Sequence, residues 1–349
     1  MKTQTLPAQT PEELVVATQA AVAHLRRGEP VALPTETVYG LAADALDVNA
    51  ALKIFEAKER PRFDPLIVHL PDRGWLARIV AMPSDDERLI GDLLDRFWPG
   101  PLSLILPRQD IVPDIVTAGL QTVAVRISAH PIFKEIIEAF DKPLAAPSAN
   151  RFGRISPTAA THVADELQGR IPVIVDGGAT KYGLESTIVA VRNERIEILR
   201  HGPITAEQLG ELGSVREVTS PKRPEAPGQL RSHYAPRTRL QLTTSLTSFQ
   251  PPPGRIGALS FEPMEKAGYA ETRALSAAGN LREAAANLFR HLRALDDARL
   301  DLIVAEEIPE EGLGRAIMDR LRRAAARQGL RPAAKEFECV SSDAPDKPE

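Results

Sequence analysis

The sequence predicts an α/β protein in which a large mixed sheet is followed by a second, smaller α/β unit. Short apolar runs alternate along the chain with amphipathic segments, which is the pattern of strands and connecting helices. The runs 186–191 and 195–199 flank a three-residue turn and predict a hairpin, so the sheet should not be purely parallel. At 349 residues the chain exceeds the usual size of one core, and two domains are expected.

The first elements are predicted by helix caps and by a proline. Thr10 and Glu13 form a capping box, with proline at the first helical position, which predicts a helix that runs to about Gly28. The apolar run 30–33 predicts a short buried strand, which Pro34 ends because it lacks a ladder donor. The same kinds of signal predict a helix over 48–59, a strand over 66–70 and a capping box at Ser84 and Glu87 that opens a helix ending at Trp98.

The alternation continues to the hairpin and then changes character. Strands are expected over 102–106, 122–127, 143–146 and 171–175, with helices over 131–140 and from Ser156-Pro157. Serine, proline, lysine, arginine and glycine then replace apolar periodicity, and a smaller α/β pattern follows. The predicted division is a large α/β domain over 1–213, a linker or ordered crossing loop over 214–238, a small α/β domain over 239–340 and a disordered tail over 341–349.

Composition and charge narrow the class of protein. Hydrophobic residues make up 43% and charged residues 26%, as in ordinary globular proteins. The net charge of −4 argues against unspecific binding of nucleic acid. The single cysteine, Cys339, excludes an internal disulfide, which suits a reducing compartment. The N-terminal residues have no apolar export segment and no run is apolar enough to anchor the chain, so a cytoplasmic location without membrane contact is expected.

The stretch from Pro34 to Ala45 places polar residues directly after a buried strand. Thr35, Glu36 and Thr37 arrive where the sheet ends, and in α/β domains this edge is where ligands collect. The alternative is a threonine that caps a following helix, and the residues alone leave both interpretations open.

Lys58, Arg60 and Arg62 place three cations within five residues at the predicted end of a helix. The helix dipole favours such cations by about 0.3 to 1 kcal/mol, so a structural role explains them equally well. Pro61 ends the helix, and a buried strand that carries His69 follows at once. The cations should therefore lie near the sheet edge, where a compact cluster of lysine and arginine suits a triphosphate.

Further candidates lie at other strand ends. Arg126 sits inside the apolar run 123–127, and a buried guanidinium needs an anionic partner, a question that Arg200 poses more weakly. The segments 145–150 and 176–187 join strand ends to small, polar and glycine residues, which form turns or allow a ligand close to the backbone. No nucleotide-binding glycine loop, serine elbow or metal-spaced histidine pair is present, so the site should orient reactants and neutralise charge.

Seven motifs follow one another over about residues 10–210: PTETVYGLAADA, KERPRFDPLIVH, FWPGPLSLIL, VAVRISAHP, PLAAPSAN followed by ISPT, GLESTIV, and ILRHGPIT. In this order they closely resemble the threonylcarbamoyl-AMP synthase family. The segment APGQLRSHYAP and the trailing domain are similar to the two-domain long form of that family. The resemblance implies a YrdC-like catalytic domain, with an open twisted sheet and helices around a concave cavity, and a smaller Rossmann-like C-terminal domain.

The resemblance also implies the reaction. L-threonine, bicarbonate or CO2, and ATP would give threonylcarbamoyl-AMP and pyrophosphate, and a separate transferase complex would modify the tRNA adenosine next to the anticodon. A threonine carbamate is itself the nucleophile toward the α-phosphorus, so the protein need not supply one. Magnesium would arrive with the ATP phosphates and not on a protein site.

Roles carry over by motif position. Threonine would be held by Thr35, His69, Arg126, Ala146 and Ser186, and the carboxylate of threonine would be the partner of the buried Arg126. ATP would be held by Lys58, Arg60, Arg62, Thr122, Ser148, Asn150, Ser156, Arg200 and Tyr234, with Lys58 and Arg60 as the catalytic cations. Glu36 would brace its turn and not act as a base.

Three positions depart from the family pattern. Asp64 replaces a common asparagine and should weaken phosphate binding unless its side chain points away. Ser128 stands where proline is usual, and Ser232 where a basic residue is common, a cation that Arg231 could replace. Two other functions stay open: an RNA-binding or ribosome-associated module, against which the balanced charge and the 5% aromatic content speak, and carbamoyl transfer from carbamoyl phosphate.

Overall fold

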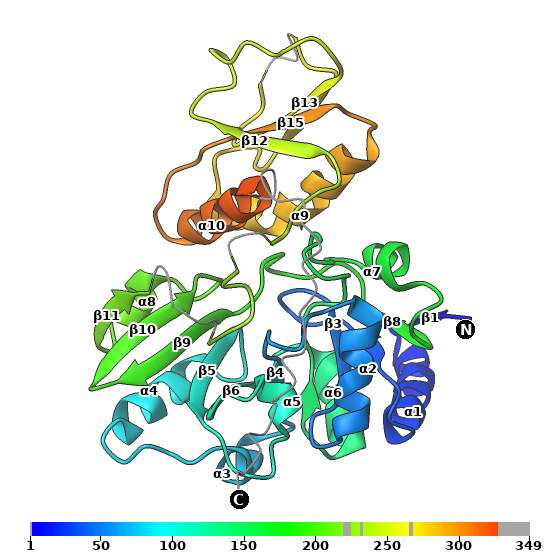
Figure 1. The fold of residues 1–349 in the computed structure, drawn as a ribbon, viewed down its shortest axis with the longest axis vertical. Coiled ribbons are helices and arrows are strands. Elements are labelled where there is room, and N and C mark those ends of the chain that lie inside the picture. The colour runs from blue at the N-terminus through cyan, green and yellow to red at the C-terminus, as the bar shows by residue number, and fades with distance from the viewer. Residues whose placement is uncertain (1, 219–224, 231–232, 265–267, 327–349) are drawn as a thin grey trace, which may run out of the picture.

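The computed structural model describes residues 2–218, 225–230, 233–264 and 268–326, which form two sheets with helices packed on them (Figure 1). The large sheet has eleven strands in the order β1-β8-β2-β3-β7-β4-β6-β5-β9-β10-β11, with parallel and antiparallel pairs. The small sheet has four parallel strands in the order β12-β15-β13-β14. The predicted α/β class, with a mixed main sheet and a smaller second domain, is confirmed.

The bounds of the elements follow the chain. The strands of the large sheet are β1 (Gln4–Pro7), β2 (Val31–Leu33), β3 (Gly40–Asp44), β4 (Ile67–His69), β5 (Leu102–Pro107), β6 (Thr122–Arg126), β7 (Leu144–Ala145), β8 (Val173–Asp176), β9 (Thr187–Arg192), β10 (Arg195–Arg200) and β11 (Ser214–Glu217). The helices of this part are α1 (Pro11–Arg26), α2 (Val48–Lys58), η1 (Arg73–Trp75), α3 (Leu76–Ile79), α4 (Glu87–Phe97), α5 (Asp114–Thr117), α6 (Pro131–Phe140), α7 (Ala160–Leu167) and α8 (Ala206–Gly210). The second domain contains β12 (Arg239–Thr243), β13 (Ile256–Ser260), β14 (Glu271–Ala274), α9 (Leu281–Asp297), β15 (Leu302–Glu306) and α10 (Leu313–Ala325).

The observed helix starts show which of the predicted capping residues cap a helix. The capping box of α1 forms as predicted, with Thr10 accepting from the amide of Glu13 at 3.3 Å. The predicted box at Ser84 does not form, because Ser84 bonds Asp85 and α4 starts after Asp86. The helix expected from Ser156-Pro157 begins only at Ala160, because the Ser156 hydroxyl is used by a tertiary contact to Glu185.

The turn after β2 leads into a strand. The Thr35 hydroxyl accepts from the amides of Thr37 and Val38 at 3.1 and 3.2 Å, as in a cap, but the chain continues into β3 and no helix follows. Local hydrogen bonds of this kind can close a turn as well as a helix end. The predicted alternative of a helix cap at this position is therefore wrong.

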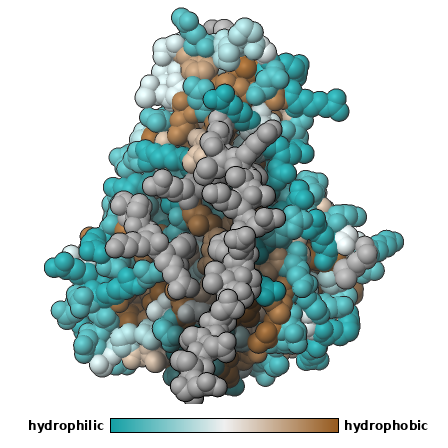
Figure 2. Space-filling model, viewed as in Figure 1, coloured by the Kyte–Doolittle hydropathy of each residue, from teal (hydrophilic) through white to brown (hydrophobic). Residues whose placement is uncertain are grey.

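The helices α9 and α10 lie between the small sheet and the large domain (Figure 1). Apolar residues of the large domain, Val38, Ile155 and Leu184, belong to the same buried cluster as Phe289 and Leu321 of these helices. The second domain therefore packs on the strand ends of the first through a shared core. On the face seen in Figure 2 the margins are polar, and the apolar residues in view lie toward the middle.

The domain boundaries remain a prediction, although β11 pairs with β10 and extends the large sheet to Glu217, into the range expected to be linker. The range 219–224, together with Arg231 and Ser232, lies outside the described residues, as does the predicted disordered tail over 341–349. Within the described part, none of the helices combines the length and the apolar character that a bilayer crossing needs.

Candidate active site

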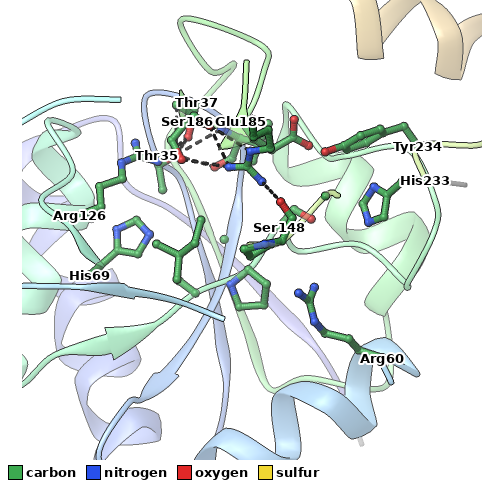
Figure 3. Close-up of a pocket in the computed structure, with 18 residues that line it drawn as sticks. Thr35, Thr37, Arg60, His69, Arg126, Ser148, Glu185, Ser186, His233 and Tyr234 are labelled. Atoms are coloured by element: carbon green, nitrogen blue, oxygen red, sulfur yellow. Dashed lines mark hydrogen bonds between the residues drawn. The ribbon is translucent and has the colours of Figure 1, made fainter. Parts of the chain in front are cut away.

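One cavity opens where several strands of the large sheet end. In the parallel pair β4 and β6, His69 stands opposite Arg126, so both side chains reach the same edge. The turn after β2 and the turn after β7 meet them there (Figure 3). The cavity is lined by Thr35, Thr37, Val38, Gly40, Arg60, Ile67, His69, Arg126, Ala146, Pro147, Ser148, Glu185, Ser186, Arg200, Pro227, Gly228, His233 and Tyr234.

Arg126 is 3% exposed and is held by two hydrogen bonds and one ion pair. Its Nε donates to the carbonyl of Gly100 at 3.1 Å, its Nη1 donates to Thr37 at 3.1 Å, and its Nη2 lies 2.6 Å from a carboxylate oxygen of Glu36. The expectation that a substrate carboxylate resolves the buried charge is corrected, because Glu36 already supplies the anion. A guanidinium has five N–H groups, and each terminal nitrogen keeps one that none of the described residues accepts.

Glu36 is fixed by residues that follow the end of β6. Its second oxygen accepts from the hydroxyl of Ser128 at 2.5 Å, and the amide of Ala129 donates to the first at 3.3 Å. Burial works to raise the pKa of Glu36, but Arg126 and the Ser128 hydrogen bond outweigh it and hold the pKa below the usual value. Glu36 is thus ionised and holds Arg126 in place. Ser128 supports Glu36 with a hydroxyl donor that proline would lack.

Thr35 lines the cavity, yet its hydroxyl is already engaged within the turn. It donates to the carbonyl of Val38 at 2.7 Å, accepts hydrogen bonds from two backbone amides and lies 2.7 Å from the hydroxyl of Thr37. A hydroxyl has one donor and two acceptor positions, so this network uses its full capacity. Thr35 shapes the wall of the cavity in this structure.

His69 is a neutral polar group inside the cavity. Burial, and then the positive charge of Arg126, lower the pKa of His69 from 6.5 to about 3. The ring packs on Phe133 with centroids 4.7 Å apart, and its Nδ1 has no hydrogen-bond partner among the described residues. This nitrogen is buried, and its hydrogen-bonding capacity is not used by any of the described residues.

A pH dependence of stability follows from His69. Below pH 6.5 the unfolded chain takes up a proton on this ring, whereas the folded protein does so only near pH 3. The free energy of unfolding should therefore fall by about 1.4 kcal/mol per pH unit between pH 6.5 and 4 through this residue alone. Urea unfolding of the wild type and of His69→Gln at several pH values measures the difference in slope. Parallel curves for the two proteins would show that His69 is not buried in a neutral state.

Arg60 reaches the cavity from the chain just after α2. Its Nη2 lies 2.9 Å from Asp64 and donates to the carbonyl of Pro65 at 2.8 Å, and its Nε donates to the carbonyl of Asp64 at 3.2 Å. Burial raises the pKa of Asp64 against the effect of Arg60. The side chain of Asp64, the residue that departs from the family pattern, thus faces Arg60 and balances its charge.

Lys58 and Asn150 lie behind the cavity wall and not on it. The Lys58 amine donates to the carbonyl of Ser148 at 2.5 Å and also to that of Asn150, and the Asn150 amide donates to two carbonyls of the same loop at 2.9 Å. Burial, and then the charge of Arg60, lower the pKa of Lys58 well below its usual value. Both residues fix the loop after β7, which carries Ser148 into the cavity.

Arg200, from the end of β10, closes the next wall. Its guanidinium donates to the carbonyl and hydroxyl of Ser186 at 3.0 Å and to the carbonyl of Pro227 at 3.1 Å. The Ser186 hydroxyl also lies 2.8 Å from that of Ser103. The segment around Pro227, which belongs to the predicted linker, is therefore tied directly to the cavity wall.

The linker also contributes Tyr234, which is 1% exposed and has a left-handed φ of 61°. Its ring lies 4.1 Å from that of His233 and is stacked at 5.5 Å on Phe289 of α9. Burial raises the pKa of Tyr234 to about 12, so the phenol stays neutral. An added Cβ on Gly228 (φ 86°) would lie 2.7 Å from this hydroxyl, so glycine is required there.

The structure brings together most, but not all, of the predicted site residues. Those that line the cavity are Thr35, Arg60, His69, Arg126, Ala146, Ser148, Ser186, Arg200 and Tyr234. Arg62 is exposed, and Thr122 starts β6 in a separate depression beside Arg192, because it stands at the opposite end of the strand from Arg126. Sequence reasoning did not assign Glu185, although an acidic residue between leucine and serine ahead of a buried strand was a usable signal.

Comparisons with known proteins identify the family of the chain. The family model described as telomere recombination matches residues 23–202, and the model described as the threonylcarbamoyl-AMP synthase C-terminal domain matches residues 204–326. Threonylcarbamoyl-AMP synthase of Pyrococcus abyssi is 39% identical over 323 residues, which cover 87% of this chain and 92% of that protein. The Bacillus subtilis protein of the same name is 40% identical over 328 residues, covering 89% and 93%.

A solved structure extends the similarity to both domains. The crystal structure of P. abyssi Sua5 complexed with L-threonine superposes with a TM-score of 0.84 at 36% identity and covers 93% of this chain and 98% of that one. Two domain models and relatives at about 40% identity thus span nearly the whole described fold, and the chain belongs to the threonylcarbamoyl-AMP synthase family in its two-domain form.

Proposed function

We propose that the protein joins L-threonine, bicarbonate or CO2, and ATP to form L-threonylcarbamoyl-AMP and pyrophosphate. The observation that carries the proposal is the division of one cavity into two halves. Arg126 and His69 stand on one side of it, and Arg60, His233 and Tyr234 stand on the other (Figure 3). A small amino acid and a nucleotide could therefore be held face to face.

The threonine half would use the polar side chains that line it. The guanidinium of Arg126 suits the two oxygens of a carboxylate, and the imidazole of His69, which also lines the cavity, suits the amine or the hydroxyl. Thr35, Ala146 and Ser186 would complete the walls. Since Glu36 already balances Arg126, this half is suited to a zwitterion, whose net charge is zero.

The nucleotide half would use Arg60, Arg200, Ser148 and Tyr234 from the cavity wall. Lys58, Asn150 and Ser156 would act from behind that wall by fixing its loops, and their predicted direct contacts with ATP are not needed for this role. In the reaction, a carbamate oxygen bonds to the α-phosphorus while the bond from that phosphorus to the bridging oxygen breaks. Pyrophosphate leaves with the electron pair.

Magnesium would be bound by the triphosphate. No cluster of three or more histidine, cysteine, aspartate or glutamate side chains occurs in the part of the chain that the structure describes, so a protein-held metal site is not part of the proposal. The ion would neutralise phosphate charge when ATP brings it. The product would serve a transferase complex that modifies tRNA in the cytoplasm.

The direct test measures pyrophosphate release from ATP with bicarbonate, in the presence and absence of L-threonine. We expect release only when threonine is present, because the carbamate of threonine is the nucleophile. Release without threonine would contradict the proposal. Turnover of carbamoyl phosphate without threonine would instead establish carbamoyl transfer, and a salt-dependent tRNA shift without any turnover would favour an RNA-binding module.

A further inference from the structure

A guanidinium of the second domain is buried against the cavity wall. Arg320, on α10, is 0% exposed and is among the largest fully buried side chains of the described residues. Its Nε donates to a carboxylate oxygen of Glu185 at 3.1 Å, and its Nη1 donates to Asp319 at 2.9 Å. Its Cζ lies 5.2 Å from the centre of the Tyr234 ring, within range of a cation–π contact.

The partners of Arg320 connect it to the active site. Glu185 and Tyr234 both line the cavity, and the other carboxylate oxygen of Glu185 accepts from the hydroxyl of Ser156. Glu185 therefore joins α10 of the second domain to the segment ahead of α7. Arg320 touches the cavity only through these residues, since it is not itself part of the lining.

Packing alone does not explain a charge at this position. A buried ion pair gains little stability over an apolar side chain of similar volume, because both charges lose their hydration. The Nη2 of Arg320 also lacks a hydrogen-bond partner among the described residues. What a guanidinium provides, and an apolar side chain does not, is a fixed direction for the Glu185 carboxylate and the Tyr234 ring.

We propose that Arg320 is a positioning residue for the nucleotide half of the site, through which the second domain fixes Glu185, Ser156 and Tyr234. The inference rests on the proposed function. It concerns the nucleotide half because Tyr234 and Arg126 lie on opposite sides of the cavity (Figure 3). The second domain is then a part of the ATP site and not an independent module.

The experiment compares ligand affinities in the full chain by calorimetry, with magnesium and α,β-methylene-ATP as one probe and L-threonine as the other. Arg320→Met leaves Glu185 uncompensated and can fail to fold, so the deciding variant is Glu185→Gln with Arg320→Met, which removes both charges. We expect this double variant to bind the ATP analogue at least tenfold more weakly and threonine within twofold of the wild type. Arg320→Lys, which keeps the charge, should recover part of the nucleotide affinity.

The matched control is Arg322→Met on the same helix, where the side chain is half exposed and donates to Glu310 at 2.8 Å. It should leave both affinities unchanged. Wild-type affinity for the analogue in the double variant would overturn the proposal, and so would an equal loss of both ligands. A wild-type protein without threonine-dependent pyrophosphate release would instead refute the proposed function itself.

Discussion

Arg126→Ala should lower the affinity for L-threonine by a factor of about 30 to several thousand, which corresponds to about 2 to 5 kcal/mol. The guanidinium is 3% exposed, and each of its terminal nitrogens keeps an N–H group that none of the described residues accepts. A carboxylate bound there exchanges its hydration for two charge-assisted hydrogen bonds. Calorimetric titration with threonine measures the loss, and the affinity for α,β-methylene-ATP should change by less than about threefold.

The structure adds a control for Arg126. Alanine leaves Glu36 buried without its cation, which should also reduce stability by about 3 to 5 kcal/mol. The paired variant Glu36→Gln with Arg126→Met removes both charges and should regain most of that stability without regaining threonine affinity. If the paired variant binds threonine as the wild type does, Arg126 does not receive the carboxylate.

Gly183→Ala should reduce the free energy of unfolding by about 2 to 4 kcal/mol. Gly183 has a φ of 68°, and an added Cβ would lie 2.6 Å from the Cα and the carbonyl oxygen of Ala286 in α9. These are backbone atoms of the other domain, so they cannot move aside as a flexible side chain would. The strain falls on the contact between the domains, and urea unfolding followed by circular dichroism measures it.

Gly153→Ala is the matched control for this effect. Gly153 has a similar φ of 77°, but an added Cβ would meet no atom within 4 Å. This variant should reduce the free energy of unfolding by only about 1 kcal/mol, because alanine has to adopt the left-handed conformation there. Equal losses in the two variants would mean that close packing of Gly183 on α9 contributes nothing to stability.

The fold was predictable where the signal was local. The capping box at Thr10 and the hairpin around Asn193 depend on residues next to each other, and both formed as expected. The helix start expected at Ser156 was wrong because its hydroxyl is taken by Glu185, 29 residues away in the sequence. A tertiary contact of this kind leaves no local trace.

The candidate site was predictable in its residues and less so in their partners. Arg126 was singled out because a cation inside an apolar strand needs an anion. The structure places Arg126 in the cavity wall. The anion is Glu36, which the strand-end position of Arg126 alone could not reveal, since the pairing depends on how β2 and β6 are ordered in the sheet. Thr122 shows the reverse case, because it shares a strand with Arg126 but stands at the opposite end.

The two arginines with a carboxylate of their own, Arg126 with Glu36 and Arg60 with Asp64, have a consequence for how substrates arrive. Each pair is closed at 2.6 and 2.9 Å, so the cavity presents a weaker positive field than its arginines alone would give. Long-range attraction of an anion depends on net charge, whereas a hydrogen bond formed on contact does not. Association of zwitterionic threonine with its half of the cavity should therefore respond little to ionic strength, and selection should occur after encounter, when the ligand meets the donors of that half.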